Sequence, residues 1–449
     1  MRIHERFKSR FGFLMAATGF AIGLGNIWRF PYVTGENGGA AFVLIYLGCA
    51  VLIALPILIA EIAIGRNGRD VPPQAMESIA GMSQGSRNWR HVGHWNLMTA
   101  FLIMGTYSVI AGWVLSYLFE VTFSGFGSAA LDSASDRFGL IQSNISGMVV
   151  WTGVALLITG IIISAGVEKG IERSVAVLMP MLFFLMVGLV IYNAVAGGFL
   201  EALNYLFAPD FGKVTGATFL AAVGQAFFSV GVAMAGMMIF GSYLPESLSI
   251  VKCSILVLVA DTCISLLAGL MIFPMVFRFG LDPAGGVGLI FQVLPVAFAQ
   301  LPMGRLLGSV FFLLLSVAAI TSMVGFVEPL VAWFSQKFNK SRLQSTGSVM
   351  VAISLVSMIS ILSYTLIADW QLAGMDFNGI VDFISNQIML PIGGLLLAVF
   401  AAWVMSPEMI RSELGLEGSG WFKVWHYLIR FAVPLAIGAI LITGLFDFS

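Results

Sequence analysis

The sequence predicts an all-α polytopic membrane protein whose chain crosses the bilayer eleven times. Of its 449 residues, 59% are hydrophobic and only 10% are charged, and the mean hydropathy is +0.97. Soluble domains carry about a quarter charged residues, so these values exclude an ordinary soluble enzyme. The apolar residues also gather in runs of about 20, the length that a helix needs to cross the hydrocarbon while satisfying its own backbone.

The apolar runs form two consecutive sets of five and one further helix. The first set lies near 12–34, 40–65, 92–122, 147–165 and 174–197, and the second near 215–240, 250–277, 303–335, 346–368 and 380–404. We expect one transmembrane domain over 1–449, with one structural repeat at about 12–197, a second at about 215–404 and an extra helix at about 424–445. The first run contains Arg29 and Glu36 and leads straight into the second, which is not the pattern of a cleavable signal peptide.

Lys and Arg are unevenly divided between the two sets of loops, which predicts the orientation of the chain. One side holds sixteen of them: Arg2, Arg6, Lys8, Arg10, Arg66, Arg69, Arg87, Arg90, Lys169, Arg173, Lys252, Lys337, Lys340, Arg342, Arg411 and Lys423. The other side holds only Arg137, Lys213, Arg278 and Arg305. We therefore expect the N-terminus in the cytoplasm and, with an odd number of spans, Ser449 outside.

Charge and histidine content exclude two classes of function. The net charge of -1 offers no basic face for nucleic acid. The four histidines, His4, His91, His94 and His426, all fall at span ends or in tails. With no histidine available inside a span as base or metal ligand, an intramembrane protease or metalloprotease is disfavoured.

Five ionisable residues fall within the expected spans, where charge is costly and usually functional. They are Arg29, Glu61, Asp261, Glu328 and Asp382. For Glu61, a helix-end charge that reaches the interface is an equally good interpretation. Asp261 is different, because about ten apolar-rich residues flank it on each side. It must face a polar cavity or a cation, or be protonated.

Two spans contain residues that favour an interrupted helix. Gly19–Pro31 reads GFAIGLGNIWRFP and Phe227–Gly236 reads FFSVGVAMAG. Each glycine lowers helix stability by about 1 kcal/mol, and unwound carbonyls and half-helix termini can hold a cation and a carboxylate. Small residues in membrane helices also serve close packing. Asn26 and Arg29 favour the functional interpretation, since close packing does not require them.

Thr321 and Ser322 form a hydroxyl pair in the eighth span. Such hydroxyls most often bond to their own helix, and alone they would carry no functional meaning. Beside two broken helices they could complete an oxygen cage for a monovalent cation.

These stretches together resemble the neurotransmitter:sodium symporter family, whose bacterial leucine transporter is the structural prototype. The motifs are GLGNIWRFPY (Gly23–Tyr32), ENGG (Glu36–Gly39), KGIER (Lys169–Arg173), GQAFFS (Gly224–Ser229), the stretch DTCISLLAGL from Asp261, and AITS (Ala319–Ser322). The resemblance covers nearly the whole chain and implies two inverted five-helix repeats with helices 1 and 6 broken. The eleven spans are similar to the short bacterial members, which implies the bacterial cytoplasmic (inner) membrane.

The resemblance implies two sodium ions, no organic cofactor, and an amino-acid substrate. One sodium site would use Gly19, Ile22, Ala318, Thr321 and Ser322. The other would use Ala21, Asn26, Ser229, Asp261 and the carboxylate of the substrate. The substrate would lie among Ala21, Gly23, Leu24, Gly25, Ile103, Tyr107, Ile110, Phe228, Ser229, Gly231, Met234, Ser322, Gly325 and Phe326.

The resemblance also implies gates on both sides. Arg29 and Asp382 would form the outer gate, and Tyr107 and Phe228 a lid over the substrate. The family's inner gate pairs an N-terminal Arg with an Asp after span eight, but these positions here are His4 and Gln336. That ion pair is therefore absent or replaced by Arg2 or Arg6.

The implied function is sodium-coupled symport of a neutral amino acid, hydrophobic or aromatic, into the cell. Gly23 stands where amine-transporting members have a carboxylate, so the substrate must bring its own. The chloride site of the animal members corresponds to Tyr46, Gln225, Ser229, Asp261 and Ser265. Asp261 replaces a usual asparagine there and supplies a fixed charge, so we expect no chloride requirement. A channel or a non-transporting sensor with the same cages remains open from the sequence.

Overall fold

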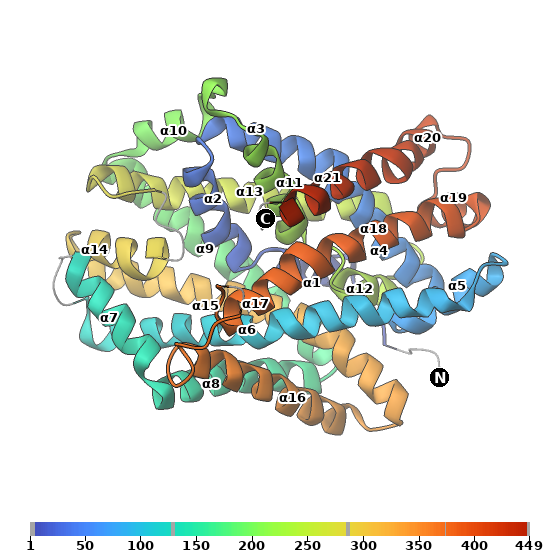
Figure 1. Ribbon diagram of the computed structural model, residues 1–449, viewed down its shortest axis with the longest axis horizontal. Helices are drawn as coiled ribbons and strands as arrows, with labels where there is room; N and C mark the ends of the chain where they lie inside the picture. The colour runs from blue at the N-terminus through green and yellow to red at the C-terminus, as the bar shows by residue number, and fades with distance from the viewer. Residues whose placement is uncertain (1–4, 127–130, 284–287, 373, 447–449) are drawn as a thin grey trace.

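The computed structural model describes residues 5–126, 131–283, 288–372 and 374–446. Most of its helices run along the long axis of the molecule (Figure 1). Within these residues the only strand-like pairing is an isolated bridge between Leu372 and Met375. The expectation of an all-α protein is confirmed.

Nine helical segments of the described chain are long and apolar enough to cross a membrane, and a bent pair makes a tenth. The nine are Ala40–Gly68, Arg87–Ser124, Ile145–Ser164, Val167–Ala196, Ile250–Arg278, Gly304–Phe338, Arg342–Ser363, Phe377–Val404 and Gly420–Ile442. Each overlaps one expected span, with ends that differ by at most seven residues.

Several of these segments are built from α-helices joined by π-helical turns. The α-helices of all nine segments are α3 (Ala40–Cys49), α4 (Leu55–Gly68), α6 (Arg90–Ser124), α8 (Ile145–Ser164), α9 (Arg173–Ala196), α13 (Ile250–Arg278), α15 (Gly304–Phe338), α16 (Arg342–Ser363), α17 (Phe377–Asp382), α18 (Leu390–Val399), α20 (Gly420–Tyr427) and α21 (Val433–Phe446). The π-helical turn Val167–Glu172 precedes α9.

The first and sixth expected spans are broken, as the glycines predict. In the first, α1 (Arg10–Ala21) is followed by a π-helical turn, Gly25–Arg29, and α2 (Phe30–Glu36), with a bend of 51°. In the sixth, α11 (Gly216–Val230) and α12 (Gly236–Tyr243) are separated by five residues. Because these two helices are individually short, length alone does not confirm the count of eleven spans.

Five short helices lie between the expected spans. They are α5 (Pro72–Met82), α7 (Leu131–Ser143), α10 (Phe199–Phe207), α14 (Leu294–Ala299) and α19 (Pro407–Leu414). Hydropathy over a membrane-length window does not detect such short elements.

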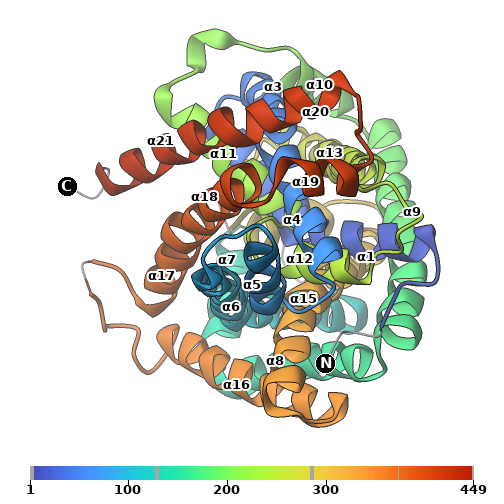
Figure 2. The ribbon, with the colours of Figure 1, turned by 90° about the vertical axis from the view of Figure 1, so that its right-hand side faces the viewer.

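The broken helices lie in the centre of the bundle. In both views α1 and α12 lie side by side against α15 (Figures 1 and 2). In the most apolar stretch of α15, 89% of the residues are buried, whereas the share is 28% in α8 and in the segment containing α9, and 39% in α16. Helices α8, α9 and α16 therefore cover the outside, and the polar residues of the breaks are enclosed by α4, α6, α13 and α15.

Candidate functional site

The break of the first span leaves backbone N–H groups that side chains must satisfy. Helix α1 ends at Ala21, and Ile22 is extended with φ −78° and ψ 93°. The N–H of Gly23 donates to Oδ1 of Asn26 over 3.2 Å, and that of Leu24 donates to the Tyr107 hydroxyl over 3.3 Å. Donors of this kind at a helix start can bind an anion such as a carboxylate.

The break of the sixth span contains three residues with left-handed backbone. Gly231 has φ +71°, and both Ala233 and Ala235 have φ +63°. Glu61 of α4 is fully buried, and its Oε2 accepts the N–H of Ala233 over 3.0 Å. Glu61 therefore supports the break from inside the bundle and is not a helix-end charge at the interface.

A fully buried polar cluster around Asp261 joins the two broken spans. The Asn26 Nδ2 lies 2.6 Å from Oδ1 of Asp261 and 3.0 Å from each of the hydroxyls of Ser229 and Ser265. Ser229 donates to Oδ2 of Asp261 over 2.7 Å. None of these four side chains is exposed. The carboxylate and hydroxyl groups supply oxygen ligands of the kind that hard cations prefer, whereas the Asn26 amide faces them with its nitrogen.

The residues equivalent to the chloride site are only partly brought together. The Tyr46 hydroxyl donates to Oδ2 of Asp261 over 3.3 Å, so it belongs to the same cluster as Ser265. Gln225 bonds elsewhere: its Nε2 donates to the Gly25 carbonyl over 3.2 Å, and its Oε1 accepts from Arg29.

The hydroxyl pair of α15 lies against the end of α1. Ser322 donates to the carbonyls of Gly19 and Phe20 over 3.3 and 3.2 Å. Thr321 instead bonds to its own helix, at 3.0 Å from the carbonyl of Val317 and 3.1 Å from that of Ala318. The sodium site predicted from Gly19, Ile22, Ala318, Thr321 and Ser322 would thus lie between the end of α1 and the facing side of α15.

A cavity of about 530 Å³ opens beside the break of the first span and the end of α11. Six of the predicted substrate-binding residues line it: Leu24, Gly25, Ile103, Tyr107, Ile110 and Phe228. The others do not: Ala21, Gly23, Ser229, Gly231, Met234, Ser322, Gly325 and Phe326. Of this second group Met234, Ser322 and Phe326 are at most 5% exposed.

The two predicted outer-gate residues line this cavity but form no ion pair with each other in the described structure. Arg29 donates to Gln225, and its guanidinium lies 5.3 Å from the centre of the Phe228 ring. Asp382 accepts from Asn386 of the next turn over 2.6 Å.

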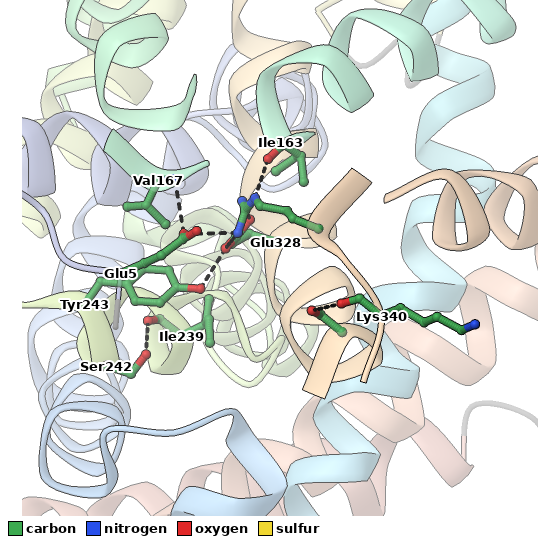
Figure 3. Close-up of polar contacts among 10 residues, drawn as sticks. Glu5, Ile163, Val167, Ile239, Ser242, Tyr243, Glu328 and Lys340 are labelled. Carbon is green, nitrogen blue, oxygen red and sulfur yellow. Dashed lines mark hydrogen bonds and ion pairs between the residues drawn. The ribbon is translucent and has the colours of Figure 1, made fainter. Parts of the chain in front are cut away.

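The opposite end of the bundle is closed by a network around Glu328 and Arg342, a pairing that the sequence does not predict. Arg342 donates to Glu328 and, over 3.1 Å, to Oε2 of Glu5. The Tyr243 hydroxyl donates to Oε1 of Glu328 over 2.7 Å. Figure 3 shows the carboxylates of Glu5 and Glu328 and the hydroxyl of Tyr243 converging from three segments.

The residues expected at the inner gate do not form this network. His4 lies outside the described residues, and within them Oε1 of Gln336 has no hydrogen-bond partner. Here the N-terminal segment supplies the anion, Glu5, and α16 supplies the cation, Arg342. The charges are therefore the reverse of those in the family's pair, in which the N-terminal residue is an Arg. The sequence contained one clue, Glu328 within a span, but Arg342 reads simply as one of the loop cations.

Further contacts fix the N-terminal segment against α12 and Glu172. Phe7 is 2% exposed and packs on Phe240 and Tyr243 of α12 with ring centres 5.9 and 6.1 Å apart. The backbone N–H of Lys8 and the hydroxyl of Ser9 both donate to Glu172, over 2.9 and 2.8 Å.

The protein is a bundle of apolar helices in which two spans are broken around buried oxygen atoms, next to an open cavity. This is the architecture of a multi-pass membrane transporter. The chain belongs to the sodium:neurotransmitter symporter family, whose profile matches residues 4–127 and 138–449. The expectations of a sodium-dependent transporter and of a protein that is not an enzyme are confirmed, because this is a family of transporters.

Individual relatives support this family assignment. The chain is 36% identical over 435 residues to YhdH, an uncharacterised sodium-dependent transporter of Bacillus subtilis (strain 168), and the match covers 96% of each chain. It is 32% identical to an uncharacterised sodium-dependent transporter of Haemophilus influenzae, over 98% of each. The crystal structure of MhsT in complex with L-phenylalanine superposes with a TM-score of 0.91 at 38% identity, covering 98% of this chain and 100% of that one.

Proposed function

We propose that this protein is a sodium-coupled symporter that carries a neutral amino acid into the cell by alternating access, without chloride. One observation carries the proposal: the fully buried Asp261 bonds both to Asn26 in the break of the first span and to Ser229 just before the break of the sixth. A cation bound among these groups would join the two broken spans and offset the charge of the carboxylate.

Two sodium ions and the amino acid are assigned to the residues that the family motifs imply. One ion is held by Ala21, Asn26, Ser229, Asp261 and the substrate carboxylate, and the other by Gly19, Ile22, Ala318, Thr321 and Ser322. The substrate carboxylate also meets the N–H groups near Leu24 and Gly25 and the Tyr107 hydroxyl. The L-phenylalanine in MhsT supports an amino acid with a hydrophobic or aromatic side chain.

The proposal includes the placement of the chain in the membrane. The protein lies in the bacterial cytoplasmic membrane with its N-terminus inside and its C-terminus outside. Its single domain comprises two inverted repeats and an extra helix. In this orientation the cavity beside Arg29 and Asp382 faces outward, and the network around Arg342 faces the cytoplasm.

Uptake into proteoliposomes tests the proposal. An inward sodium gradient should drive accumulation of at least one of the twenty labelled amino acids above its external concentration, and an equal potassium gradient should not. Passive flux without accumulation would indicate a channel. Sodium-dependent binding without flux would indicate a sensor. Either result would contradict symport.

A further inference from the structure

One arginine lies inside the last membrane-length segment, Gly420–Ile442, without a counter-charge from the described residues. The guanidinium of Arg430 lies over two aromatic rings, 5.3 Å from the centre of Trp403 and 5.7 Å from that of Phe431. Its Nε is buried, and no described residue accepts a hydrogen bond from it. None of the ion pairs among the described residues includes Arg430. The two rings contact the cation but cannot neutralise it.

Other arginines at this end of the bundle are neutralised within the chain. Arg66 pairs with Glu413 of α19, and Arg342 pairs with Glu328 of α15. A charged side chain within a membrane span is costly and is almost always paired. Because Arg430 has no such carboxylate among the described residues, we expect its counter-ion to come from outside the chain.

His426 and Arg411 lie along the same stripe as Arg430. His426 lies one turn before Arg430 in the same segment, and its Nδ1 is buried without a hydrogen-bond partner in the described structure. The Phe422 ring, one turn earlier still, stacks on His426 with ring centres 5.6 Å apart. The guanidinium of Arg411, from α19, lies 4.6 Å from the centre of the Phe422 ring. Because residues four apart share one face of a helix, these contacts align three basic side chains.

This stripe lies at the surface of the bundle. In both views α19 lies beside α20 (Figures 1 and 2). Four aromatic residues around the stripe are between 46% and 73% exposed: Trp403, Trp421, Tyr427 and Phe431. Trp and Tyr in membrane proteins gather at the level of the lipid headgroups. In the orientation proposed above this end of the bundle is cytoplasmic, so the stripe faces the headgroups of the inner leaflet.

We infer that Arg411, His426 and Arg430 form a binding site for the phosphate group of an anionic phospholipid of the inner leaflet. Arginine binds phosphate in a planar, bidentate geometry, and an imidazole adds an N–H donor. Basic pockets between membrane helices on the cytoplasmic side bind acidic headgroups in the same way. The inference takes only the orientation in the membrane from the proposed function.

The competing role is packing alone, in which Arg430 only joins its segment to Trp403 of the preceding span. Trp403 lies in the π-helical turn Phe400–Val404 that follows α18. Packing alone predicts that removing the charge of Arg430 affects the binding of every phospholipid alike, whatever the charge of its headgroup.

Lipid titration followed by native mass spectrometry separates the two roles. The purified protein in detergent is titrated with phosphatidylglycerol or with phosphatidylcholine of the same acyl chains, and the fraction that retains one lipid gives an apparent affinity. The parent should bind phosphatidylglycerol more tightly. Arg430→Gln and Arg411→Gln should each lower the affinity for phosphatidylglycerol about fivefold, the contribution of one cation near a membrane surface, and leave that for phosphatidylcholine unchanged.

Two further variants control for folding and for net charge. Arg430→Lys keeps the charge and should retain most of the preference. Arg411 is exposed on α19, so Arg411→Gln tests the site even if Arg430→Gln does not fold. Lys252→Gln removes one exposed cation from α13 at the same end of the molecule, and this matched control should leave the preference unchanged.

A preference for phosphatidylglycerol that survives the double variant Arg411→Gln with Arg430→Gln would overturn the inference. So would an equal loss of affinity for both lipids. Displacement of the bound phosphatidylglycerol by inorganic phosphate at equal concentration would assign these cations to a soluble anion and overturn the choice of a lipid. The titration needs neither sodium nor an amino acid, so its failure leaves the proposed symport intact, and a failure of uptake leaves the lipid site intact.

Discussion

Arg342 binds Glu328 through both carboxylate oxygens, with Nη2 2.6 Å from Oε2 and Nη1 3.1 Å from Oε1. Glu328 is fully buried within α15, whereas the side chain of Arg342 is 20% exposed. The guanidinium is thus the only cation that the described structure places on this carboxylate, and the geometry is the bidentate one that arginine forms best.

Removing the cation from this pair should destabilise the protein strongly. Arg342→Met leaves the Glu328 carboxylate buried with only Tyr243 as a donor, which should lower the free energy of unfolding by roughly 3 kcal/mol. Thermal unfolding in detergent measures the effect. Adding Glu328→Leu should recover most of the loss, because no buried charge then remains. Lys8→Met, which breaks the exposed Lys8–Glu168 pair, is the control and should change nothing measurable. Equal effects of the two single variants would contradict this account.

Thr321→Ala should weaken sodium binding before it alters substrate selectivity. Loss of one hydroxyl ligand costs about 1 kcal/mol, which raises the sodium concentration for half-maximal transport roughly fivefold. Ser316→Ala is the matched control, because Ser316 is a buried hydroxyl of α15 that bonds only within its own helix in the described structure. If Thr321→Ala leaves the sodium dependence unchanged, Thr321 is not a sodium ligand.

Transport should not require chloride. The Asp261 carboxylate already supplies negative charge beside Tyr46 and Ser229, and a chloride ion about 4 Å away would be repelled by about 4 kcal/mol at an effective dielectric of about 20. Replacing chloride with gluconate should therefore leave uptake by the parent intact. Asp261→Asn should be inactive or stimulated by chloride. Loss of uptake by the parent in gluconate would refute the prediction, and a fully active, chloride-indifferent Asp261→Asn would reduce Asp261 to a structural role.

Decarboxylated amines should not be transported. Gly23 offers no carboxylate to pair with an ammonium group, and a Cβ there would lie within 3.0 Å of the Ser322 hydroxyl, so the position has no room for one. Tryptamine should fail to displace a bound labelled amino acid at concentrations where tryptophan does so. Sodium-driven uptake of tryptamine or dopamine, with no amino acid transported, would contradict the substrate assignment.

The spans and the two breaks could be predicted because their causes are local. Hydropathy alone locates segments such as Gly304–Phe338, and glycines near Asn26 and Ser229 indicate where helices are interrupted. Asp261 was predictable for the same reason, since about ten apolar-rich residues on each side leave a carboxylate no route to water.

Other features depend on neighbours distant in the sequence. Whether Glu61 reaches the interface or the core depends on which side of α4 faces α12, and no local pattern determines this. The ion pair of Arg342 with Glu328 could not be predicted, because in the sequence Arg342 is one of many cations in the loops. A Cβ on Gly236 or Gly325 would collide with the ring of Phe20, and this constraint exists only once α1, α12 and α15 are assembled.

The break in the sixth span is imposed by its surroundings as much as by its own residues. Alanine is the best helix former, and in an ordinary helix replacing it with glycine costs about 1 kcal/mol. At Ala233 and Ala235 the backbone is left-handed, which costs a residue with a Cβ roughly 1–2 kcal/mol. Glycine at either position should therefore stabilise the protein, a reversal of sign that marks where tertiary contacts hold α11 and α12 apart.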